Sequence, residues 1–397
     1  MTDALRALLD PRVPPGRVAR AWRTTLDRLM PLGGASDGNQ ITPFFDGDDA
    51  YEAMLAAIHA AKTRVWLETY ILAPDRAGRL FLAALLAARQ RGVAVIVIFD
   101  VVGSNTLRSE HILPLIKAGV RVVPFNPPRP VLGRLSVFLR DHRKILIVDD
   151  DVAFCGGMNI SEDYAGFRHG NGRFRDTHAL VEGPAVADLA AVFAGSVATT
   201  TREQLEPPAP VAPLASGVFA QVLGSNVLRR RRHIQRALFT TVGRSVTHCY
   251  LTTPYFVPPP RLLRALIRAA KRGVDVRIVT AGVSDVPIVA IAARHLYGSL
   301  LRAGVRIFEM TKHTLHAKTA SIDGVYASVG SFNLDRWSFT RNLEVNLTVV
   351  DAGLASELTR QFSIDEALSR EIHAAEYSLR SVLVRAIGWL AYQLVRR

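Results

Sequence analysis

Two histidines and two lysines with the same spacing are the residues of this chain best placed to do chemistry. His142 and Lys144 lie in the stretch "DHRKILIVDD", and His316 and Lys318 repeat the pair. Lysine is rare, with six Lys against 43 Arg, and random placement gives only about 0.2 His-x-Lys pairs. Imidazoles act as nucleophiles or general acids near neutral pH, and ammonium groups bind phosphate-like anions.

The whole neighbourhood of each pair is repeated. "HRKILIVDDDVAFCGGMN" (142–159) aligns without a gap with "HAKTASIDGVYASVGSFN" (316–333), and every offset is 174 residues, as in 316 − 142. A repeat of this length indicates a duplicated structural unit. A shared fold alone explains the common apolar pattern, but it does not explain a shared His and Lys. The other polar positions in common are Asp149 and Asn159 in the first copy and Asp323 and Asn333 in the second.

Strands and helices are predicted to alternate in both copies, which is typical of an α/β fold. A glycine at each helix end suits the left-handed position that closes a helix. In the first copy we expect strands at 64–72, 93–102 and 120–125 and helices at 78–92 and 109–119. In the second we expect strands at 247–256, 274–282 and 305–310 and helices at 261–273 and 293–304.

The predicted strand that carries each motif brings the two copies into one site. Side chains two residues apart on a strand share a face, so His142 and Lys144 point the same way, as do His316 and Lys318. We therefore expect two homologous domains, each a β-sheet flanked by helices, packed about a pseudo-twofold axis with one shared active site. This single site would contain two imidazoles and two ammonium groups.

Composition indicates a globular protein with an anionic partner. The chain has 397 residues, 49% of them hydrophobic, and a formal charge of +14, which favours nucleic acid or an anionic membrane surface. Cys155 and Cys249 fall in apolar stretches and are expected to be packing residues in a reducing compartment. We expect no signal peptide, and no apolar run reaches the roughly 18 residues needed to cross a bilayer.

The order of segments along the chain predicts five parts. The tail has an apolar helical face and arginines beside it, which is typical of an interfacial helix; the alternative is a helix packed on the core. The proline-containing loop 124–140 is a second candidate for a lipid entrance. The parts are an N-terminal helical segment (1–40), a first domain (41–205), a linker (206–217), a second domain (218–365) and a C-terminal amphipathic helix (366–397).

The motif HxKxxxxD, followed after six residues by G-[GS]-x-N and present twice, resembles the phospholipase D superfamily. The stretches "ETYIL", "TTPYFVP", "LHAK", "GSFNLDRWS" and "NLEVNL" are similar to bacterial cardiolipin synthases, and in particular to the shorter members without N-terminal transmembrane helices. The resemblance implies a two-step phosphatidyl transfer without a metal or other cofactor. Two phosphatidylglycerols would give cardiolipin and glycerol through a phosphohistidine.

The resemblance also implies roles for individual residues. His142 would be the nucleophile, and His316 would protonate the departing glycerol and then deprotonate the incoming hydroxyl. Glu344, 28 residues after His316, is where the family places a carboxylate that fixes the imidazole tautomer, and Asp176, 34 residues after His142, is the candidate in the first copy. The groups expected to hold the phosphate oxygens are Lys144, Lys318, Asn159, Asn333 and, on one side only, the Ser331 hydroxyl.

Asp149 and Asp323 complete the family's motif and are counted with its catalytic residues. Both follow the strand, so their position favours bracing of a turn over contact with substrate.

The alternatives are a phospholipase D-type hydrolase, a nuclease that uses the same histidines, and a membrane-binding scaffold without activity. Intact motifs in both copies argue against the scaffold, and no aromatic-rich basic groove for nucleic acid is visible. We expect anionic phospholipid as the partner, no nucleic acid, and no need for an oligomer to complete the site. The expected location is the cytoplasmic face of the bacterial inner membrane, as a peripheral protein.

Overall fold

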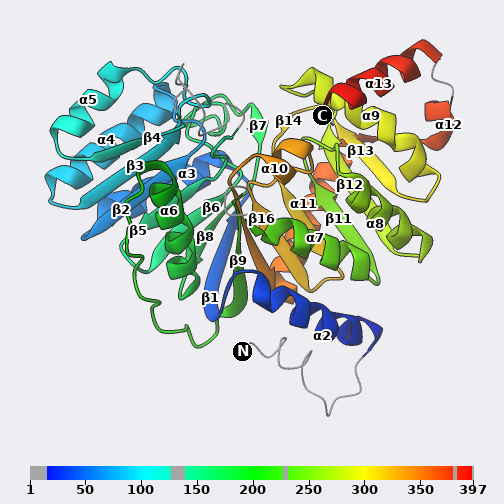
Figure 1. The fold of residues 1–397 in the computed structure, drawn as a ribbon, viewed down its shortest axis with the longest axis horizontal. Coiled ribbons are helices and arrows are strands. Elements are labelled where there is room, and N and C mark those ends of the chain that lie inside the picture. Colours follow the sequence, from blue (N-terminus) through cyan, green and yellow to red (C-terminus); the bar gives the residue numbers. More distant parts are fainter. Residues whose placement is uncertain (1–15, 127–138, 227–230, 379–381, 396–397) are drawn as a thin grey trace.

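The structure, a computed structural model, describes residues 16–126, 139–226, 231–378 and 382–395. Its two halves lie side by side and follow one another along the chain (Figure 1). Most of the loop 124–140 lies outside the described residues.

The first half follows a short helical entry formed by α2 (Arg17–Leu29) and the 3-10 helix η1 (Met30–Leu32). Its elements are β1 (Gly34–Phe44), α3 (Gly47–Ala60), β2 (Arg64–Thr69), α4 (Arg76–Gln90), β3 (Ala94–Asp100), α5 (Ser109–Lys117), β4 (Arg121–Phe125), β5 (Ile145–Val148), β6 (Val152–Gly156), β7 (Phe174–Arg175), β8 (His178–Glu182) and α6 (Ala185–Thr201).

The second half repeats this order after residues 202–214, which have no regular structure. Its elements are β9 (Val218–Asn226), β10 (Arg231–Arg232), α7 (His233–Arg244), β11 (His248–Thr252), α8 (Pro260–Lys271), β12 (Asp275–Ala281), α9 (Pro287–Leu301), β13 (Arg306–Met310), β14 (Thr314–Leu315), β15 (Thr319–Ile322), β16 (Tyr326–Gly330), α10 (Arg336–Thr340), β17 (Glu344–Val350), α11 (Ala352–Ala367), β18 (Ser369–Glu371), α12 (Ala374–Ser378) and α13 (Val382–Val395).

All ten strands and helices predicted above are present, with ends shifted by a few residues. The glycines predicted to close helices have positive φ, for example 93° at Gly92 and 88° at Gly273. A side chain at these positions would strain the backbone, so glycine is favoured there. The predicted α/β class is confirmed.

A single sheet runs through both halves. On one side its strands follow the order β1-β8-β6-β5-β2-β3-β4, and on the other the matching order β9-β17-β16-β15-β11-β12-β13, with β18 at the edge. The antiparallel pair β1–β9 joins the two sides, with Gly34 opposite Val222. The pseudo-twofold relation between the halves therefore passes between these two central strands.

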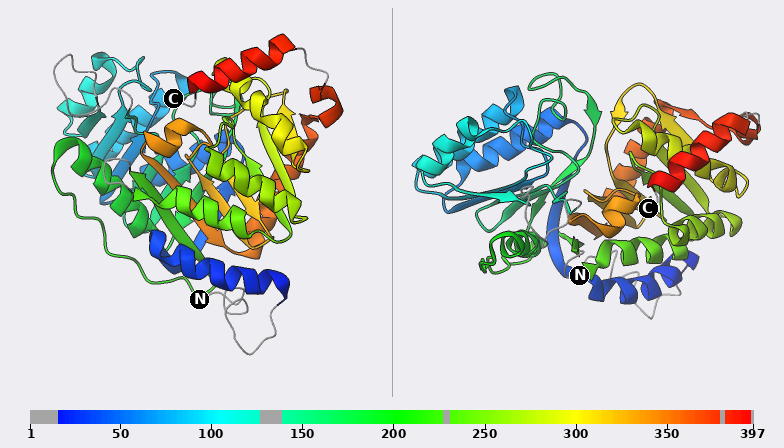
Figure 2. Two further views of the ribbon diagram at one scale, coloured as in Figure 1. Left: turned by 45° about the vertical axis from the view of Figure 1, so that its right-hand side comes forward. Right: turned by 45° about the horizontal axis from the view of Figure 1, so that its top comes forward.

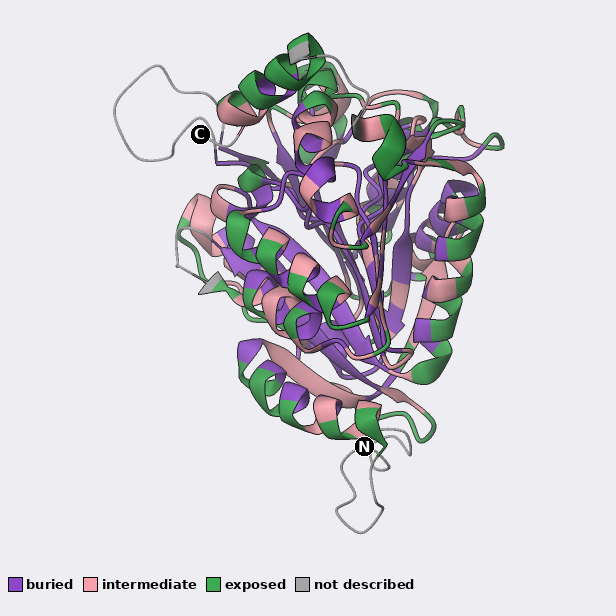
Figure 3. Cartoon of the chain, turned by 90° about the vertical axis from the view of Figure 1, so that its right-hand side faces the viewer, coloured by how far each residue is buried: buried purple, intermediate pink, exposed green. Residues whose placement is uncertain are grey.

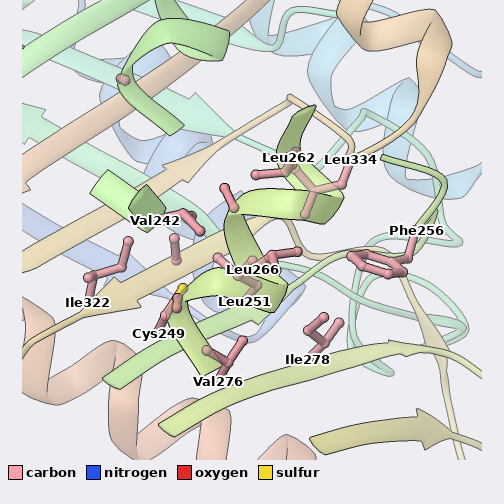
Figure 4. Packing of buried hydrophobic residues seen from close by; sticks show 14 of the residues in the cluster. Val242, Cys249, Leu251, Phe256, Leu262, Leu266, Val276, Ile278, Ile322 and Leu334 are labelled. Carbon is pink, nitrogen blue, oxygen red and sulfur yellow. The ribbon is translucent and has the colours of Figure 1, made fainter. Parts of the chain in front are cut away.

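Apolar side chains cover both faces of the sheet. Figure 3 shows that the strands are mostly buried while the helices present exposed residues on their outer sides. In the second half, Leu262 and Leu266 of α8 pack over Val276 and Ile278 of β12 (Figure 4). Cys249 is fully buried in the same cluster.

The N-terminal segment packs on the second half, although it precedes the first. Trp22 stacks on Tyr326 at 5.5 Å, and its Nε1 donates to Asp323 at 2.9 Å. The predicted boundary at residue 40 is wrong, because the helical segment ends at Leu32 and β1 begins at Gly34.

The C-terminal segment is also more varied than the single amphipathic helix expected for 366–397. It continues α11, adds the edge strand β18 and the short α12, and ends in α13. The structure packs α13 against α9 at the top of the second half (Figures 1 and 2). Of the helices in the described ranges, none has the length and apolar character that crossing a membrane requires.

Candidate active site

Each histidine lies in a segment that pairs with the opposite half of the molecule. The amide of His142 donates to the carbonyl of Leu343 at 3.0 Å, and the amide of His316 donates to that of Arg175 at 2.8 Å. The strands predicted to contain these histidines begin only after the lysines, at Ile145 and Thr319. Both histidines are therefore held at the interface between the halves.

The two buried carboxylates lie on the histidines of the opposite halves. Asp176 Oδ2 is 2.6 Å from His316 Nδ1, and Glu344 Oε2 is 3.2 Å from His142 Nδ1. Each carboxylate therefore faces the histidine of the other copy and not the histidine that precedes it in its own copy. The cross-half pairing of β7 with β14 and of Asp141 with Leu343 explains the exchange.

The strand register shows that Asp176 and Glu344 are equivalent positions despite their unequal spacing. Gly156 pairs with His178, and the equivalent Gly330 pairs with Asn346, so each carboxylate stands two residues before the partner of that glycine. The first copy has six more residues in the preceding segment, since 34 − 28 = 6.

Both imidazoles favour the neutral form. Burial, then the charge of Lys144, lowers the pKa of His142, and Glu344 opposes them. Burial and then Lys318 lower the pKa of His316 to about 4, against the effect of Asp176. Because each lysine acts on both histidines, the four groups form one electrostatic unit. With Nδ1 protonated and facing a carboxylate, each imidazole keeps its Nε2 for reaction.

Both lysines are buried and have lowered pKa values. Burial and then Lys318 lower the pKa of Lys144 to about 7, and burial lowers the pKa of Lys318 to about 8. Lys144 Nζ donates to the carbonyl of His142 at 2.8 Å, and Lys318 Nζ donates to that of His316. An anion placed between the lysines would relieve this repulsion.

The two motif asparagines each keep a polar atom available. Asn159 Oδ1 accepts from the amide of Ile71 at 3.1 Å, while its Nδ2 is buried without a hydrogen-bond partner among the described residues. Within the same part of the chain, Asn333 Oδ1 is buried and unpartnered.

Ser331 was expected to bind a phosphate oxygen, and in the structure its hydroxyl contacts a carboxylate. Its hydroxyl donates to Glu344 Oε2 at 2.5 Å, so it holds the carboxylate that contacts His142. Ser338 and Asn342 donate to the other oxygen of Glu344 at 2.7 and 3.2 Å. Burial raises the pKa of Glu344, but the charge and hydrogen bond of His142, the charge of Lys144 and the hydrogen bond from Ser331 outweigh burial and lower it, so the group is ionised.

Asp149 and Asp323 lie at the far ends of β5 and β15 and brace turns there. Asp149 accepts hydrogen bonds from the amides of Lys62, Thr63 and Arg64. Asp323 accepts from the amides of residues 246–248 and from the indole of Trp22. Both residues were counted with the catalytic group, but their positions support the bracing of turns and not contact with substrate.

Three aromatic residues of the first half surround the histidines and were missed by sequence reasoning. Tyr164 Oη is 3.4 Å from His316 Nε2, and Phe174 lies 5.3 Å from the same ring. Tyr70 lies 5.1 Å from the ring of His142. Tyr164 aligns with Ser338 through the 174-residue offset, so comparing the two copies beyond the asparagine could have found this difference.

A buried ionic network beneath His142 was also missed. Burial raises the pKa of both Glu68 and Asp141, and Arg143 opposes the shift in both. Glu68 raises the pKa of Asp141 further, whereas the hydrogen bond with Asp141 lowers that of Glu68. Ser196 Oγ donates to Glu68 Oε1 at 2.5 Å and accepts from Arg143 Nη1 at 2.7 Å. Glu68 lies within the apolar run "RVWLETYIL", and this unusual position could have indicated a buried charged group.

Among the described residues, no group of three or more His, Cys, Asp or Glu side chains is arranged to bind a metal ion. The charged groups that face the imidazoles are the two lysines and the two carboxylates, as given above.

Comparison with known proteins agrees with this geometry. The family model described as "Cardiolipin synthase, PLD-like domain" matches residues 54–187 and 238–365. Cardiolipin synthase A of Pseudomonas fluorescens SBW25 is 34% identical over 353 residues, covering 88% of this chain and 74% of the relative. Cardiolipin synthase B of Salmonella typhi is 36% identical over 324 residues, covering 80% and 78%.

Solved structures share the fold at low sequence identity. The phosphatidylserine synthase of Haemophilus influenzae has a TM-score of 0.69 at 14% identity, covering 94% of this chain and 99% of the other. The polyphosphate kinase of Porphyromonas gingivalis has a TM-score of 0.56, covering 93% and 55%. Two matched segments, each holding one His-Lys pair, establish that the chain belongs to the family of cardiolipin synthase, phospholipase D-like domain proteins.

Proposed function

We propose that this protein is a phosphatidyltransferase that joins two phosphatidylglycerols into cardiolipin and releases glycerol. The observation that carries the proposal is the crossed pair of imidazole–carboxylate contacts around two buried lysines. The cardiolipin synthase names of relatives that match most of the chain support the choice of lipid.

In the first step, Nε2 of His142 attacks the lipid phosphorus and the bond to the glycerol oxygen breaks. His316 gives its Nε2 proton to that oxygen, so glycerol leaves neutral and the phosphatidyl group remains on His142. Glu344 stabilises the positive charge that forms on His142, as Asp176 does for the protonated His316.

In the second step, a hydroxyl of another phosphatidylglycerol gives its proton to His316. Its oxygen attacks phosphorus, the phosphorus–nitrogen bond breaks, and cardiolipin leaves with His142 regenerated. Lys144 and Lys318, together with the unpartnered amide of Asn159, hold the non-bridging oxygens in both steps. The bound anion raises the low pKa of His316, because negative charge beside an imidazole favours its protonated form.

Hydrolysis and DNA cleavage use the same first step and differ in the substrate or in the acceptor. The test is to incubate the purified protein, in buffer with EDTA, with phosphatidylglycerol vesicles or with DNA, and to analyse lipids by mass spectrometry. We expect cardiolipin and glycerol and intact DNA. Phosphatidic acid as the main product would make the protein a hydrolase, cleaved DNA would make it a nuclease, and loss of activity in EDTA would contradict the metal-free mechanism.

We infer further that α13 makes a peripheral contact with an anionic membrane. Four side chains of one helical face, Leu383, Ile387, Leu390 and Leu394, are 50 to 70% exposed. A patch of apolar residues on one side of a terminal helix is typical of interfacial binding. In Figure 1, α13 lies on the same side of the molecule as β7 and β14, which lead to the catalytic segments.

Positive charge beside α13 supports the same contact. A cavity of about 810 Å³ lies between α9, α12 and α13, and Arg302, Arg385 and Trp389 are among its lining residues. Arginine near an anionic leaflet contributes about 1 kcal/mol each. A contact of this kind places the protein on a membrane surface, and the cytoplasmic face of the bacterial inner membrane is the location we propose.

A further inference from the structure

Two arginines of the first half hold the backbone of the two histidine-binding carboxylates. Arg143 Nε donates to the carbonyl of Glu344 at 3.2 Å, and Arg175 Nη1 donates to the carbonyl of Asp176 at 2.7 Å. Among the described residues, neither guanidinium donates a hydrogen bond to an imidazole, so both guanidinium groups act on the imidazoles only through other residues.

Each arginine also crosses to the second half. Arg143 Nη2 donates to the carbonyl of Ser225 on β9 at 3.0 Å. Arg175 forms a bidentate ion pair with Asp365 of α11, with Nε and Nη2 at 2.9 and 2.7 Å from the two carboxylate oxygens. Asp365 is 1% exposed, so this pair is shielded from solvent and has the fork geometry that arginine makes best.

Arg175 is in contact with both partners of the Asp176–His316 pair. Its side chain holds the carbonyl of Asp176, and its own carbonyl accepts from the amides of His316 and Ala317 at 2.8 and 3.1 Å. The 2.6 Å contact between Asp176 and His316 therefore depends on where Arg175 sits, and Asp365 fixes that place from the opposite half.

The repeated fold does not require this arrangement. In the strand register that equates Asp176 with Glu344, the residue equivalent to Arg175 is Leu343, and the residue equivalent to Arg143 is Ala317. Neither can form an ion pair. The contacts made by Arg143 and Arg175 therefore have no equivalent in the second half.

We infer that Arg175 and Asp365 are positioning residues that set the geometry of His316 through Asp176, with Asp365 fixing Arg175 from the second half. The inference rests on the proposed function, in which His316 is the general acid and base. Small displacements of an acid–base group have large effects on rate because proton transfer needs accurate alignment.

The variant Asp365→Asn tests this inference without altering a group near the substrate. We compare the release of glycerol from phosphatidylglycerol with the first-turnover burst of p-nitrophenol from a phosphatidyl p-nitrophenyl ester. Glycerol needs a proton from His316 in order to leave, whereas p-nitrophenolate leaves without one. We expect glycerol release to fall about 10-fold or more in kcat with little change in KM, and the nitrophenol burst to change by less than about 2-fold.

The matched control is Glu309→Gln in the same half. Glu309 is 3% exposed and forms a bidentate pair with Arg294 at 2.8 and 3.0 Å, away from the site. We expect this variant to lose stability without a selective loss of glycerol release. Arg175→Lys is the second variant, since one ammonium cannot bind Asp365 and the carbonyl of Asp176 in the same fork; it keeps the test available if Asp365→Asn does not fold.

Equal losses with both leaving groups, or no loss with either, would overturn the inference. The same selective loss in Glu309→Gln would show a general effect of a broken buried pair and would overturn it too. Glycerol release is measured rather than cardiolipin yield, so a wild-type protein that hydrolyses the lipid would refute the proposed function and leave this test intact.

Discussion

The two histidines have different surroundings although their motifs are equivalent. His316 has a short contact with Asp176 and is flanked by Tyr164 and Phe174, whereas His142 has a longer contact with Glu344. The carboxylate of Glu344 is itself held by three hydrogen-bond donors. A site with two unlike imidazoles suits two unlike tasks, one nucleophilic and one acid–base.

Replacement of either histidine should therefore abolish transfer. We expect His142→Ala and His316→Ala each to retain less than about 1% of the wild-type rate, because one imidazole cannot bond to phosphorus and protonate the leaving oxygen in the same step. Product formation from labelled phosphatidylglycerol measures this. Acid-quenched wild-type protein should carry phosphatidyl on His142, and a label on His316 would reverse the roles.

The lysines predict how activity depends on pH. Both have lowered pKa values, about 7 for Lys144 and about 8 for Lys318, chiefly because of burial. A lysine must be protonated to hold the phosphate, so its contribution is present below its pKa and is lost as pH rises through it. We expect kcat/KM to fall as pH rises through 7 to 8.

Bound substrate should shift this loss of activity to higher pH. Its phosphate stabilises both ammonium groups, so the fall in kcat should occur at higher pH than the fall in kcat/KM. Initial rates at subsaturating and saturating lipid, between about pH 5 and 10, separate the two profiles. A kcat/KM that stays level up to pH 9 or beyond would contradict the lowered lysine pKa values.

The sequence predicted which residues form the site better than it predicted how they pair. Type and spacing singled out His142, Lys144 and their repeats, because identical polar residues in two copies need a common cause. The partner of each imidazole depends on which segments cross between the halves, and that information lies in tertiary pairing such as Asp141 with Leu343. The contact of Ser331 with Glu344 was missed for the same reason, since it joins residues at the ends of two neighbouring strands.

At the scale of elements, α13 has two faces with different partners. Gly388 and Ala391 are buried against α9, and the ring of Tyr392 lies 5.2 Å from that of His295. Small residues on this face allow the two helices to approach closely. One face of the helix thus packs on the protein, as the alternative of a helix packed on the core expected, and the face of larger apolar residues stays exposed, where we propose the membrane contact.

Polar substitution of the exposed face should weaken membrane binding and leave the fold intact. The variant carries glutamine at Leu383, Ile387, Leu390 and Leu394. At about 25 cal/mol per Å² of apolar surface buried in the membrane, we expect binding to phosphatidylglycerol vesicles to fall at least about 10-fold. Activity on a short-chain soluble substrate should remain, because the site does not include α13.

Ala391→Asp is the matched variant on the packed face. It places a charge against α9 and should lower the thermal transition of the protein. Co-sedimentation with vesicles and a thermal melt of each variant measure the two effects. If the glutamine variant loses its thermal transition, or binds vesicles as well as the wild type, the exposed face does not contact the membrane.

At the scale of the whole molecule, one sheet makes the two halves a single body. β1 and β9 pair along the middle, and β17 and β8 flank them. The repeat predicted two equivalent units, but not their joint sheet, because strand order depends on pairings between distant segments. The stretch "GASDGNQITPF" of β1 has little apolar alternation, which also explains why the N-terminal boundary was placed too late.

Because both motifs lie in one chain across this shared sheet, the site should need no second copy. A mixture of His142→Ala and His316→Ala chains therefore should not regain activity, even after co-expression, since every chain lacks one of its two imidazoles. If the site formed instead between two chains, random pairing would give half the dimers one intact site of two, and about a quarter of the wild-type rate. Recovery near that value would contradict the single-chain site. Co-purification of the two differently tagged variants is the control, because it shows whether chains have exchanged. In exchanged dimers we expect no recovery of activity.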